Sequence, residues 1–217
     1  MRGNAWLSFG LAFVGGYSDA ASLVLADTFT GHITGSFVLA AVSVAHRDWS
    51  TFALRLTGIA LFLAGVLVSA LLERCATKPP ELLLPRVMGV EIALIVVSYI
   101  ALASHFVLSI GLFVSCMSLA LGLQNSAWRS TGGISVHTTY LTGLMTDLVT
   151  TAAQRGKPAD PKVGILCGIW VAFVFGAGIG AAMVIRFGAL GIFGAGLVLL
   201  AIIVCLSSKS SRKGDRK

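Results

Sequence analysis

Hydrophobic residues run along this chain in long blocks with few polar interruptions. Eight such segments can be marked, and they cover residues 5–26, 29–46, 51–73, 84–103, 106–127, 134–152, 162–184 and 187–207. A helix crosses the hydrocarbon of a bilayer in about 20 residues, so six of the segments are long enough to span it. The second and the sixth are shorter or more polar, and each opens with a stretch that contains Gly, Thr and His.

These segments predict helices, because their residues do not alternate between polar and apolar and an open sheet edge cannot be satisfied in lipid. Two hydrophilic joints interrupt the pattern, ERCATKPPELLLPR (73–86) and QRGKPADPK (154–162). The pair Pro79-Pro80 prevents helix continuation in the first joint. The predicted fold class is an all-α polytopic membrane protein, with a single transmembrane domain over residues 1–208.

The chain also shows an internal repeat. Three pairs of stretches match in the same order along the sequence: GYSDAAS (16–22) with GLQNSAW (122–128), HITG (32–35) with HTTYLTG (137–143), and FLAGVLVSA (62–70) with FVFGAGIGA (173–181). The pattern indicates two copies of four segments each, at about 5–103 and 106–207. Many transporters are built from two such repeats, with the binding site at the repeat interface.

The positive charges favour one topology. If all eight segments cross, the cytoplasm holds eleven of the 16 Lys and Arg residues; if the second and sixth only dip into the membrane, it holds thirteen. The second count fits the positive-inside rule better and makes the repeats inverted. Eight crossings stay open, because GSFVLAAVSVA (35–45) is apolar enough to cross. Both arrangements place the N- and C-termini in the cytoplasm.

Composition supports a membrane protein, with 56% hydrophobic and 12% charged residues. The net charge of +7 is concentrated in residues 209–217, a basic cytoplasmic tail predicted to have little ordered structure. No aromatic-interleaved basic patch indicates nucleic acid, and the expected partner is the lipid bilayer. The four cysteines have no metal-ligand spacing, no cofactor or metal is expected, and no enzyme motif is present. A homo-oligomer stays open.

Asp19 is the residue that most needs an explanation, because a carboxyl group in hydrocarbon is costly. It either hydrogen-bonds a helix end or a nearby serine, or it binds a substrate or titrates. Gln124 and Asn125 occupy the matching place in the second repeat. Paired polar side chains across a repeat axis are expected to face one cavity, which makes all three candidates for substrate binding.

Two histidines, His32 and His137, each precede a threonine-rich turn. A histidine there is either amphipathic at the interface or a proton-coupling group, since it titrates near neutral pH. The Thr-Gly pairs that follow mark either helix breaks with ligand-binding backbone or close helix packing. The candidate binding residues are therefore His32, Thr34, Gly35, His137, Thr142 and Gly143.

Two further carboxyl groups, Glu91 and Asp147, lie within apolar segments. Glu91 either extends toward Arg86 or faces a cavity, and Asp147 has the same ambiguity. With Asp19, they are the candidates for proton or ion coupling.

Four stretches together resemble the YoaK-like family of bacterial multi-pass inner-membrane proteins: GYSDA (16–20), FTGHITGS (29–36), GLQNSAWR (122–129) and VHTTYLTG (136–143). The resemblance extends over nearly the whole chain. It implies a bacterial inner-membrane location and about six spans, and it supplies no substrate.

The leading hypothesis is a small secondary transporter or permease for an unidentified small solute, with its site at the repeat interface. The alternative is a non-transporting membrane assembly protein or a lipid-interacting protein. In that case the polar motif residues would pack against each other in a dry core.

Overall fold

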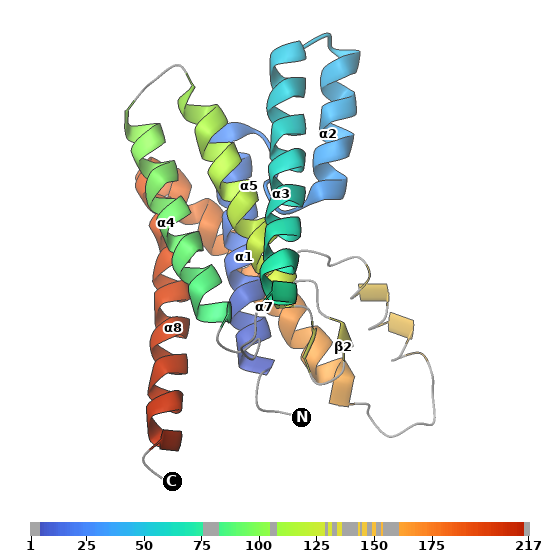
Figure 1. Ribbon diagram of the computed structural model, residues 1–217. Helices are drawn as coiled ribbons and strands as arrows, with labels where there is room; N and C mark the ends of the chain where they lie inside the picture. The colour runs from blue at the N-terminus through green and yellow to red at the C-terminus, as the bar shows by residue number, and fades with distance from the viewer. Residues whose placement is uncertain are drawn as a thin grey trace.

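The structure is a computed structural model that describes residues 5–75, 83–104, 108–128, 130–131, 134–135, 143, 145–146, 149–150, 153 and 161–214. It is a bundle of helices (Figure 1). The α-helices are α1 (Ala5–Ala26), α2 (Ile33–Ala45), α3 (Trp49–Cys75), α4 (Leu83–Ala103), α5 (Ser109–Ala127), α7 (Pro161–Phe187) and α8 (Phe193–Gly214). A short 3-10 helix, η2 (Gly188–Ile192), joins α7 to α8. The strands β1 (Ser130–Thr131) and β2 (Ile134–Ser135) form one antiparallel pair, far too short to span a membrane.

Among the described residues, five stretches are long and apolar enough to cross a membrane. Four are α1, α3, α4 and α5, and the fifth is a 46-residue stretch, Val163–Ser208, that includes both α7 and α8. These helices make the chain a multi-pass membrane protein. Helix α2 has 13 residues, which is about 20 Å of helix and too short for a hydrocarbon core of about 30 Å.

The chain reverses direction between α7 and α8. Gly188 has a positive φ of 59°, which favours glycine. Gly191 packs so closely on α7 that a Cβ there would lie 2.7 Å from backbone atoms of Met183 and Val184. The Tyr17 hydroxyl of α1 donates a hydrogen bond to the Gly191 carbonyl oxygen and ties this reversal to the first helix. The last apolar segment was predicted to begin at residue 187. Because of this reversal, α8 begins at Phe193.

Figure 1 shows that α1 begins and α8 ends at the same end of the bundle, while the α2–α3 hairpin projects at the other. Helix α8 continues to Gly214, so its backbone is helical well into the segment expected to have little order. That stretch contains no Pro, and cations near a helix C-terminus interact favourably with the helix dipole.

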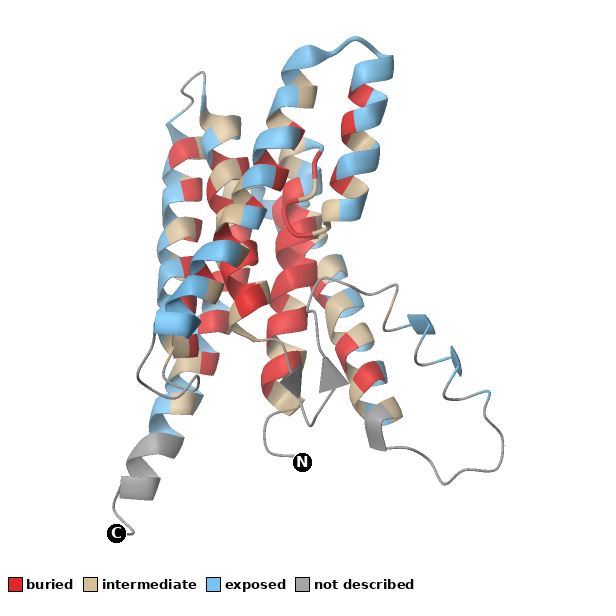
Figure 2. Ribbon diagram, turned by 45° about the vertical axis from the view of Figure 1, so that its right-hand side comes forward, coloured by how far each residue is buried: buried red, intermediate tan, exposed pale blue. Residues whose placement is uncertain are grey.

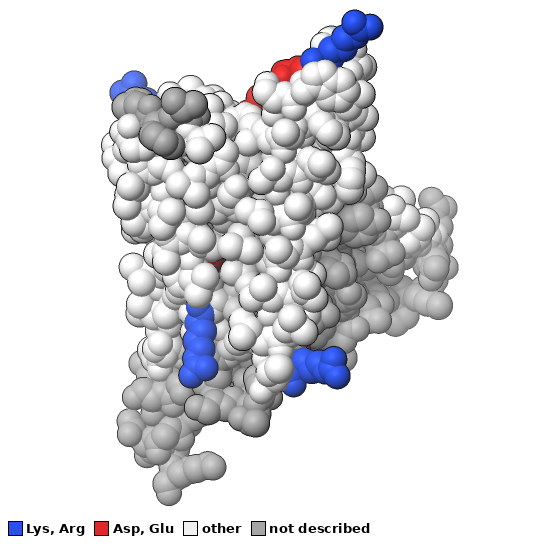
Figure 3. Space-filling view, turned by 45° about the horizontal axis from the view of Figure 1, so that its top comes forward, with Lys and Arg blue, Asp and Glu red and all other residues white. Residues whose placement is uncertain are grey.

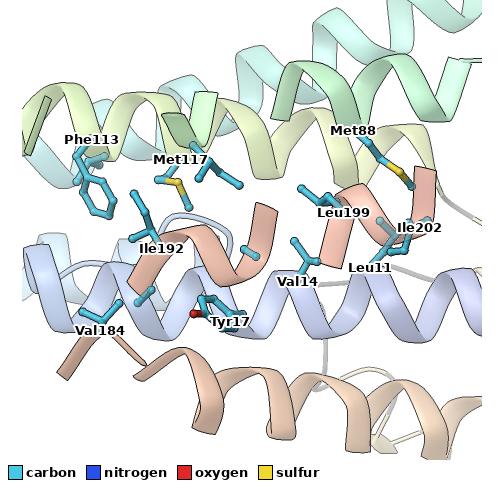
Figure 4. Packing of buried hydrophobic residues seen from close by; sticks show 14 of the residues in the cluster. Leu11, Val14, Tyr17, Met88, Phe113, Met117, Val184, Ile192, Leu199 and Ile202 are labelled. Carbon is cyan, nitrogen blue, oxygen red and sulfur yellow. The ribbon is translucent and has the colours of Figure 1, made fainter. Parts of the chain in front are cut away.

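The buried residues gather between the helices (Figure 2). The largest apolar cluster joins α1, α4, α5 and α8, and Figure 4 shows Met88, Leu199, Ile202 and Leu11 packed together within it. Figure 3 shows the basic side chains near the two ends of the bundle, with a broad band free of described Lys and Arg between them. This distribution is typical of a bundle with an apolar belt.

Glycines bring α1 into close contact with α7. A Cβ added at Gly16 of α1 would overlap the carbonyl oxygen of Phe173 on α7. A Cβ added at Gly176 of α7 would overlap the carbonyl oxygen of Phe13 on α1. Small residues at both positions therefore let the two backbones approach each other, which is a common way of packing membrane helices.

Helices α3 and α5 make the same kind of contact. A Cβ at Gly122 of α5 would overlap the carbonyl oxygen of Phe62 on α3. A Cβ at Gly65 of α3 would overlap the carbonyl oxygen of Leu119 on α5. The two closest helix pairs of the bundle, α1 with α7 and α3 with α5, are thus both joined by reciprocal glycine contacts.

Candidate functional site

The chain leaves helical geometry between α1 and α2, and Asp19 holds this break. Its Oδ1 atom accepts hydrogen bonds from the backbone N–H groups of Thr30, at 3.0 Å, and Gly31, at 2.6 Å. Asp19 is 3% exposed. A buried carboxylate that accepts backbone N–H groups satisfies donors that have no helical partner. Asp19 therefore fixes the entry to α2 from a neighbouring helix.

Hydroxyl groups complete the segment 27–32, which we call the α1–α2 loop. Ser22 Oγ and Thr30 Oγ1 are hydrogen-bonded at 3.0 Å. Ser36 Oγ donates to the Phe29 carbonyl oxygen at 3.0 Å. Thr28 and Thr30 are both buried. Irregular backbone at membrane depth is tolerated only where it is buried in protein or lines a water-filled cavity, and these contacts provide the buried surroundings.

Arg55 joins the same loop to α2 and α3. Its guanidinium donates to the Leu39 carbonyl at 2.7 Å and to Ser43 Oγ at 2.6 Å on α2. It also donates to the backbone carbonyl of Asp27 at 2.9 Å and to its carboxylate at 3.1 Å. Asp27 has a positive φ of 50° at the end of α1. The Arg55 side chain is 6% exposed and that of Asp27 86%, so the ion pair is buried on one side only.

The predicted residues His32, Thr34 and Gly35 lie at the start of α2, each in different surroundings. His32 is the N-cap residue of α2, and its ring lies 5.4 Å from that of Phe29 between centroids. Thr34 is exposed in the first turn of α2. Gly35 lies against His32 and Phe29, where a Cβ would be 2.5 Å from the histidine ring. The helix break thus precedes Thr34-Gly35, and this glycine serves packing.

The two amide side chains predicted to match Asp19, those of Gln124 and Asn125, lie near the end of α5. Gln124 Nε2 donates to the Leu11 carbonyl oxygen at 3.1 Å. Asn125 is half-buried, and its side-chain oxygen has no hydrogen-bond partner among the described residues. Leu11 precedes Asp19 by eight residues, or about 12 Å along a helix. The hydrogen bond from Gln124 therefore reaches α1 about two turns before Asp19.

Three predicted residues, His137, Thr142 and Asp147, lie outside the described residues. Gly143 is described as helical and half-buried. The candidate site can therefore be built only from its first half, which is the α1–α2 loop.

Glu91 is buried in the bundle core, at 1% exposure. Neither carboxylate oxygen has a hydrogen-bond partner within the described part of the chain. Arg86 is exposed, so the extension of Glu91 toward Arg86 is ruled out. Helix periodicity explains the difference, because five residues correspond to a rotation of about 140° around the helix.

A groove of about 570 Å³ opens elsewhere, between α3 and the α4–α5 end. Its lining includes Leu54, Thr57, Ser104, Leu112 and Ser115, and none of the predicted site residues. The groove is not lined by any residue of the α1–α2 loop, whose Thr28 and Thr30 are buried.

Sequence reasoning did not identify Arg55 or Tyr17 as important. Arg55 carried a usable signal, since an arginine inside an apolar segment is costly without partners. Tyr17 carried none, because its acceptor Gly191 is 174 residues away. Within the described ranges, no three His, Cys, Asp or Glu residues come together as a metal site would require.

Comparison with family profiles identifies the family of this chain. No curated protein and no solved structure matches the chain. A family profile, described as a protein of unknown function (DUF1275), matches residues 7–205, which include every described helix in whole or in part. The chain, with its helical bundle and its buried α1–α2 loop, therefore belongs to the DUF1275 family.

Proposed function

We propose that this protein is a small secondary transporter or permease that moves a small solute through a site at the interface of two inverted repeats. The observation that carries the proposal is the buried helix break between α1 and α2, held by Asp19. Helices interrupted at membrane depth are a feature of transporter binding sites, where unwound backbone supplies ligand groups.

Reciprocal packing supports the repeat. The sequence alignment pairs Gly16 with Gly122, and Phe62 with Phe173. In the bundle, Gly16 contacts Phe173 and Gly122 contacts Phe62. Each contact is therefore the image of the other when the repeats are exchanged, which a two-fold relation between the halves would produce.

A second pair of contacts follows the same rule. The alignment pairs Gly65 with Gly176, and an offset of 106 residues pairs Phe13 with Leu119. Gly176 contacts Phe13, and Gly65 contacts Leu119. We infer that α1 and α5 are equivalent first helices, and that each packs on the third long helix of the opposite repeat.

This relation favours six crossings and two broken segments, one of them α2. An odd number of crossings in each half inverts one repeat against the other. We propose that both termini lie in the cytoplasm, which the charge count supports. We also propose a bacterial inner-membrane location, which the resemblance to YoaK-like proteins implies. The second broken segment would be residues 134–152, which supply His137, Thr142, Gly143 and Asp147.

The solute site would lie where the α1–α2 loop meets its counterpart in the second repeat. Asp19 and His32 would contribute from the first half, and Asn125 from the second. Asp19 retains one carboxylate oxygen, Oδ2, that has no hydrogen-bond partner among the described residues. Because Asp19 is buried, this structure corresponds to a closed state, and opening would require the loop to move with α2.

One observation favours the alternative of a non-transporting assembly or lipid-interacting protein. Several polar motif residues are used internally: Asp19 by loop amides, Gln124 by the Leu11 carbonyl, and Trp128 by a 2.8 Å bond to Ser8 Oγ. Such a dry core is what a purely structural role predicts, because buried polar groups must be hydrogen-bonded.

Thermal shift measurements on the purified protein separate the two functions. Panels of amino acids, organic acids, sugars, nucleosides and inorganic ions would be screened in detergent, alongside anionic and zwitterionic lipids. A solute at 100 times its dissociation constant stabilises the bound state by about 2.7 kcal/mol. Uptake of the radiolabelled hit into proteoliposomes then tests transport.

The matched variants are His32→Ala, at the loop, and His46→Ala, at the exposed end of α2. The proposal expects solute binding and uptake to be lost in the first and kept in the second. Equal loss in both variants would remove the site from the α1–α2 loop. Stabilisation by anionic lipid alone, with no solute effective, would favour the alternative function.

A further inference from the structure

The core of the bundle contains a carboxyl group that the helix-break site does not use. Glu91 lies on α4, one turn after Met88 and one turn before Ile95, on the face buried against the bundle. Met88 packs with Leu199 and Ile202 of α8 (Figure 4). Glu91 therefore occupies a position that packing alone would assign to an apolar residue.

Among the described residues, no charged group pairs with Glu91. The elements packed on α4 are α5, α8 and η2. Their titratable and basic residues are Cys116, Cys205, Lys209, Arg212 and Lys213. Cys116 is a buried free thiol, Cys205 is exposed, and the three basic residues lie in the last turns of α8. The salt bridge found among the described residues joins Arg55 to Asp27, on other elements.

The surroundings select the ligand that Glu91 can take. A metal cation needs several oxygen ligands to replace its water, whereas the cluster residues on this face of α4 and on α8 are apolar. A proton needs only the carboxylate itself, and protonation removes the cost of burying an unpaired charge. The chemistry of the position therefore fits a proton and excludes a dehydrated metal ion.

We propose that Glu91 is a proton-binding site that exchanges its proton with water during the working cycle of the protein. Stability does not account for the residue, because a carboxyl group in a membrane helix is costly and no described residue gives this one a hydrogen bond. The hydroxyl of Ser98 lies two turns farther along the same buried face of α4, beside the thiol of Cys116 on α5. Ser98 thus supplies a polar group on the buried face of α4 between Glu91 and the C-terminal end of the helix.

The role in coupling rests on the proposed transport function, whereas proton binding by Glu91 does not. If both hold, the driving ion is a proton, and a solute found by screening would be carried with or against it. Loss of solute binding in loop variants tests transport, and the protonation state of Glu91 is measured without any solute. The two proposals can therefore fail separately.

Infrared spectroscopy of the full chain in proteoliposomes tests the proposal directly. The C=O stretch of a neutral carboxylic acid is separated from amide and carboxylate bands and shifts when the proton is replaced by deuterium. The wild-type spectrum minus that of Glu91→Gln isolates this residue. Glu73→Gln, which changes an exposed residue at the end of α3, is the matched control.

We expect a neutral-acid band that is lost in Glu91→Gln, retained in Glu73→Gln, and shifted after transfer to D₂O. A difference spectrum that shows a carboxylate in place of the acid would overturn the proposal. An acid band that never shifts in D₂O would overturn it equally, because a proton sealed in the core cannot be exchanged. Melting curves of all three proteins confirm that the compared samples are folded.

Discussion

The Oδ1 atom of Asp19 accepts a hydrogen bond of 2.6 Å from the backbone N–H of Gly31, twelve residues farther along the chain. The same oxygen accepts the N–H of Thr30. One carboxylate of α1 therefore satisfies two buried donors in the segment that leads into α2. This contact holds the helix break in place.

Replacing Asp19 tests how far this contact stabilises the bundle. Asp19→Leu should lower the free energy of unfolding by about 1–3 kcal/mol for each stranded N–H. Asp19→Asn keeps a carbonyl oxygen that can accept both bonds and removes the buried charge, so it should fold nearly as well as the wild type. Ser18→Ala is the neighbouring control, because that hydroxyl has no partner among the described residues. Equal melting temperatures for Asp19→Leu and Ser18→Ala would show that the loop does not need the carboxylate.

Arg55 and Asp27 should respond unequally to mutation. Arg55→Met removes four donated hydrogen bonds from a buried side chain and should cost about 1.5–3 kcal/mol. Asp27→Asn affects the exposed member of the pair and should cost less than about 1 kcal/mol. Denaturation of both variants in the same detergent gives the comparison. A larger loss for Asp27→Asn would mean that the ion pair, and not the backbone contacts of Arg55, joins α2 to the bundle.

The outcome for individual residues shows what the sequence could predict. The first apolar segment, 5–26, coincides with α1, because helix length in a membrane follows from local hydrophobicity. Thr34-Gly35 was predicted to mark either a helix break or close packing. The break lies in residues 27–32, and Gly35 packs against His32 and Phe29. That position is held by hydrogen bonds that Asp19 accepts from Thr30 and Gly31 and that Arg55 donates to Asp27. These partners are distant in sequence, and no local pattern predicts them.

The candidate site was predicted only in part, for a similar reason. Asp19 was identified because a carboxyl group in an apolar segment is rare and costly. Its partners were not, since loop amides carry no sequence signal. The relation of Glu91 to Arg86 could have been excluded from helix periodicity alone, because the two residues face different directions. Repeat matching was the most informative pattern, since it paired the glycines that later proved to make reciprocal contacts.

Asp48 provides a pH-dependent contribution to stability outside the membrane spans. It precedes α3, and its carboxylate accepts the Ser50 hydroxyl at 2.7 Å and the Thr51 N–H at 3.0 Å. Hydrogen bonds from Thr51 and Ser50 lower the pKa of Asp48 to about 2. Because the folded-state pKa lies below the unfolded value of about 3.9, this stabilisation is complete above pH ~4 and is lost as the pH falls toward 2.

Melting temperatures between neutral pH and pH ~2 check this. Asp48→Ala should melt below the wild type at neutral pH, and the difference should shrink as the carboxylate is protonated. Asparagine caps a helix about as well as aspartate and does not titrate. The melting temperature of Asp48→Asn should therefore change with pH only through the other titratable groups of the protein. A wild-type advantage over Asp48→Ala that persists unchanged at the lowest pH would show that the cap acts without its charge.

The reciprocal glycine contacts give the sharpest test of the two-fold relation. Gly16→Ala and Gly122→Ala each place a methyl group against a carbonyl oxygen of the facing helix, Phe173 or Phe62. Each should lower the free energy of unfolding by about 1–3 kcal/mol, as overpacking does in a close-packed interface. The proposed repeat makes the two contacts equivalent, so it expects the two losses to be similar. The double variant should lose close to the sum, since the two contacts share no residue.

Gly178→Ala is the matched control for these variants. It lies in α7, within the same glycine-rich stretch as Gly176, but a Cβ there meets nothing within 4 Å. Alanine should therefore be neutral or should stabilise α7 by up to about 1 kcal/mol, since glycine is the poorer helix former. Chemical denaturation of the wild type and the four variants in one detergent provides all the comparisons. A severe loss for Gly16→Ala beside a neutral Gly122→Ala would contradict the equivalence of the two helix pairs and, with it, the inverted-repeat architecture on which the proposed transport site depends.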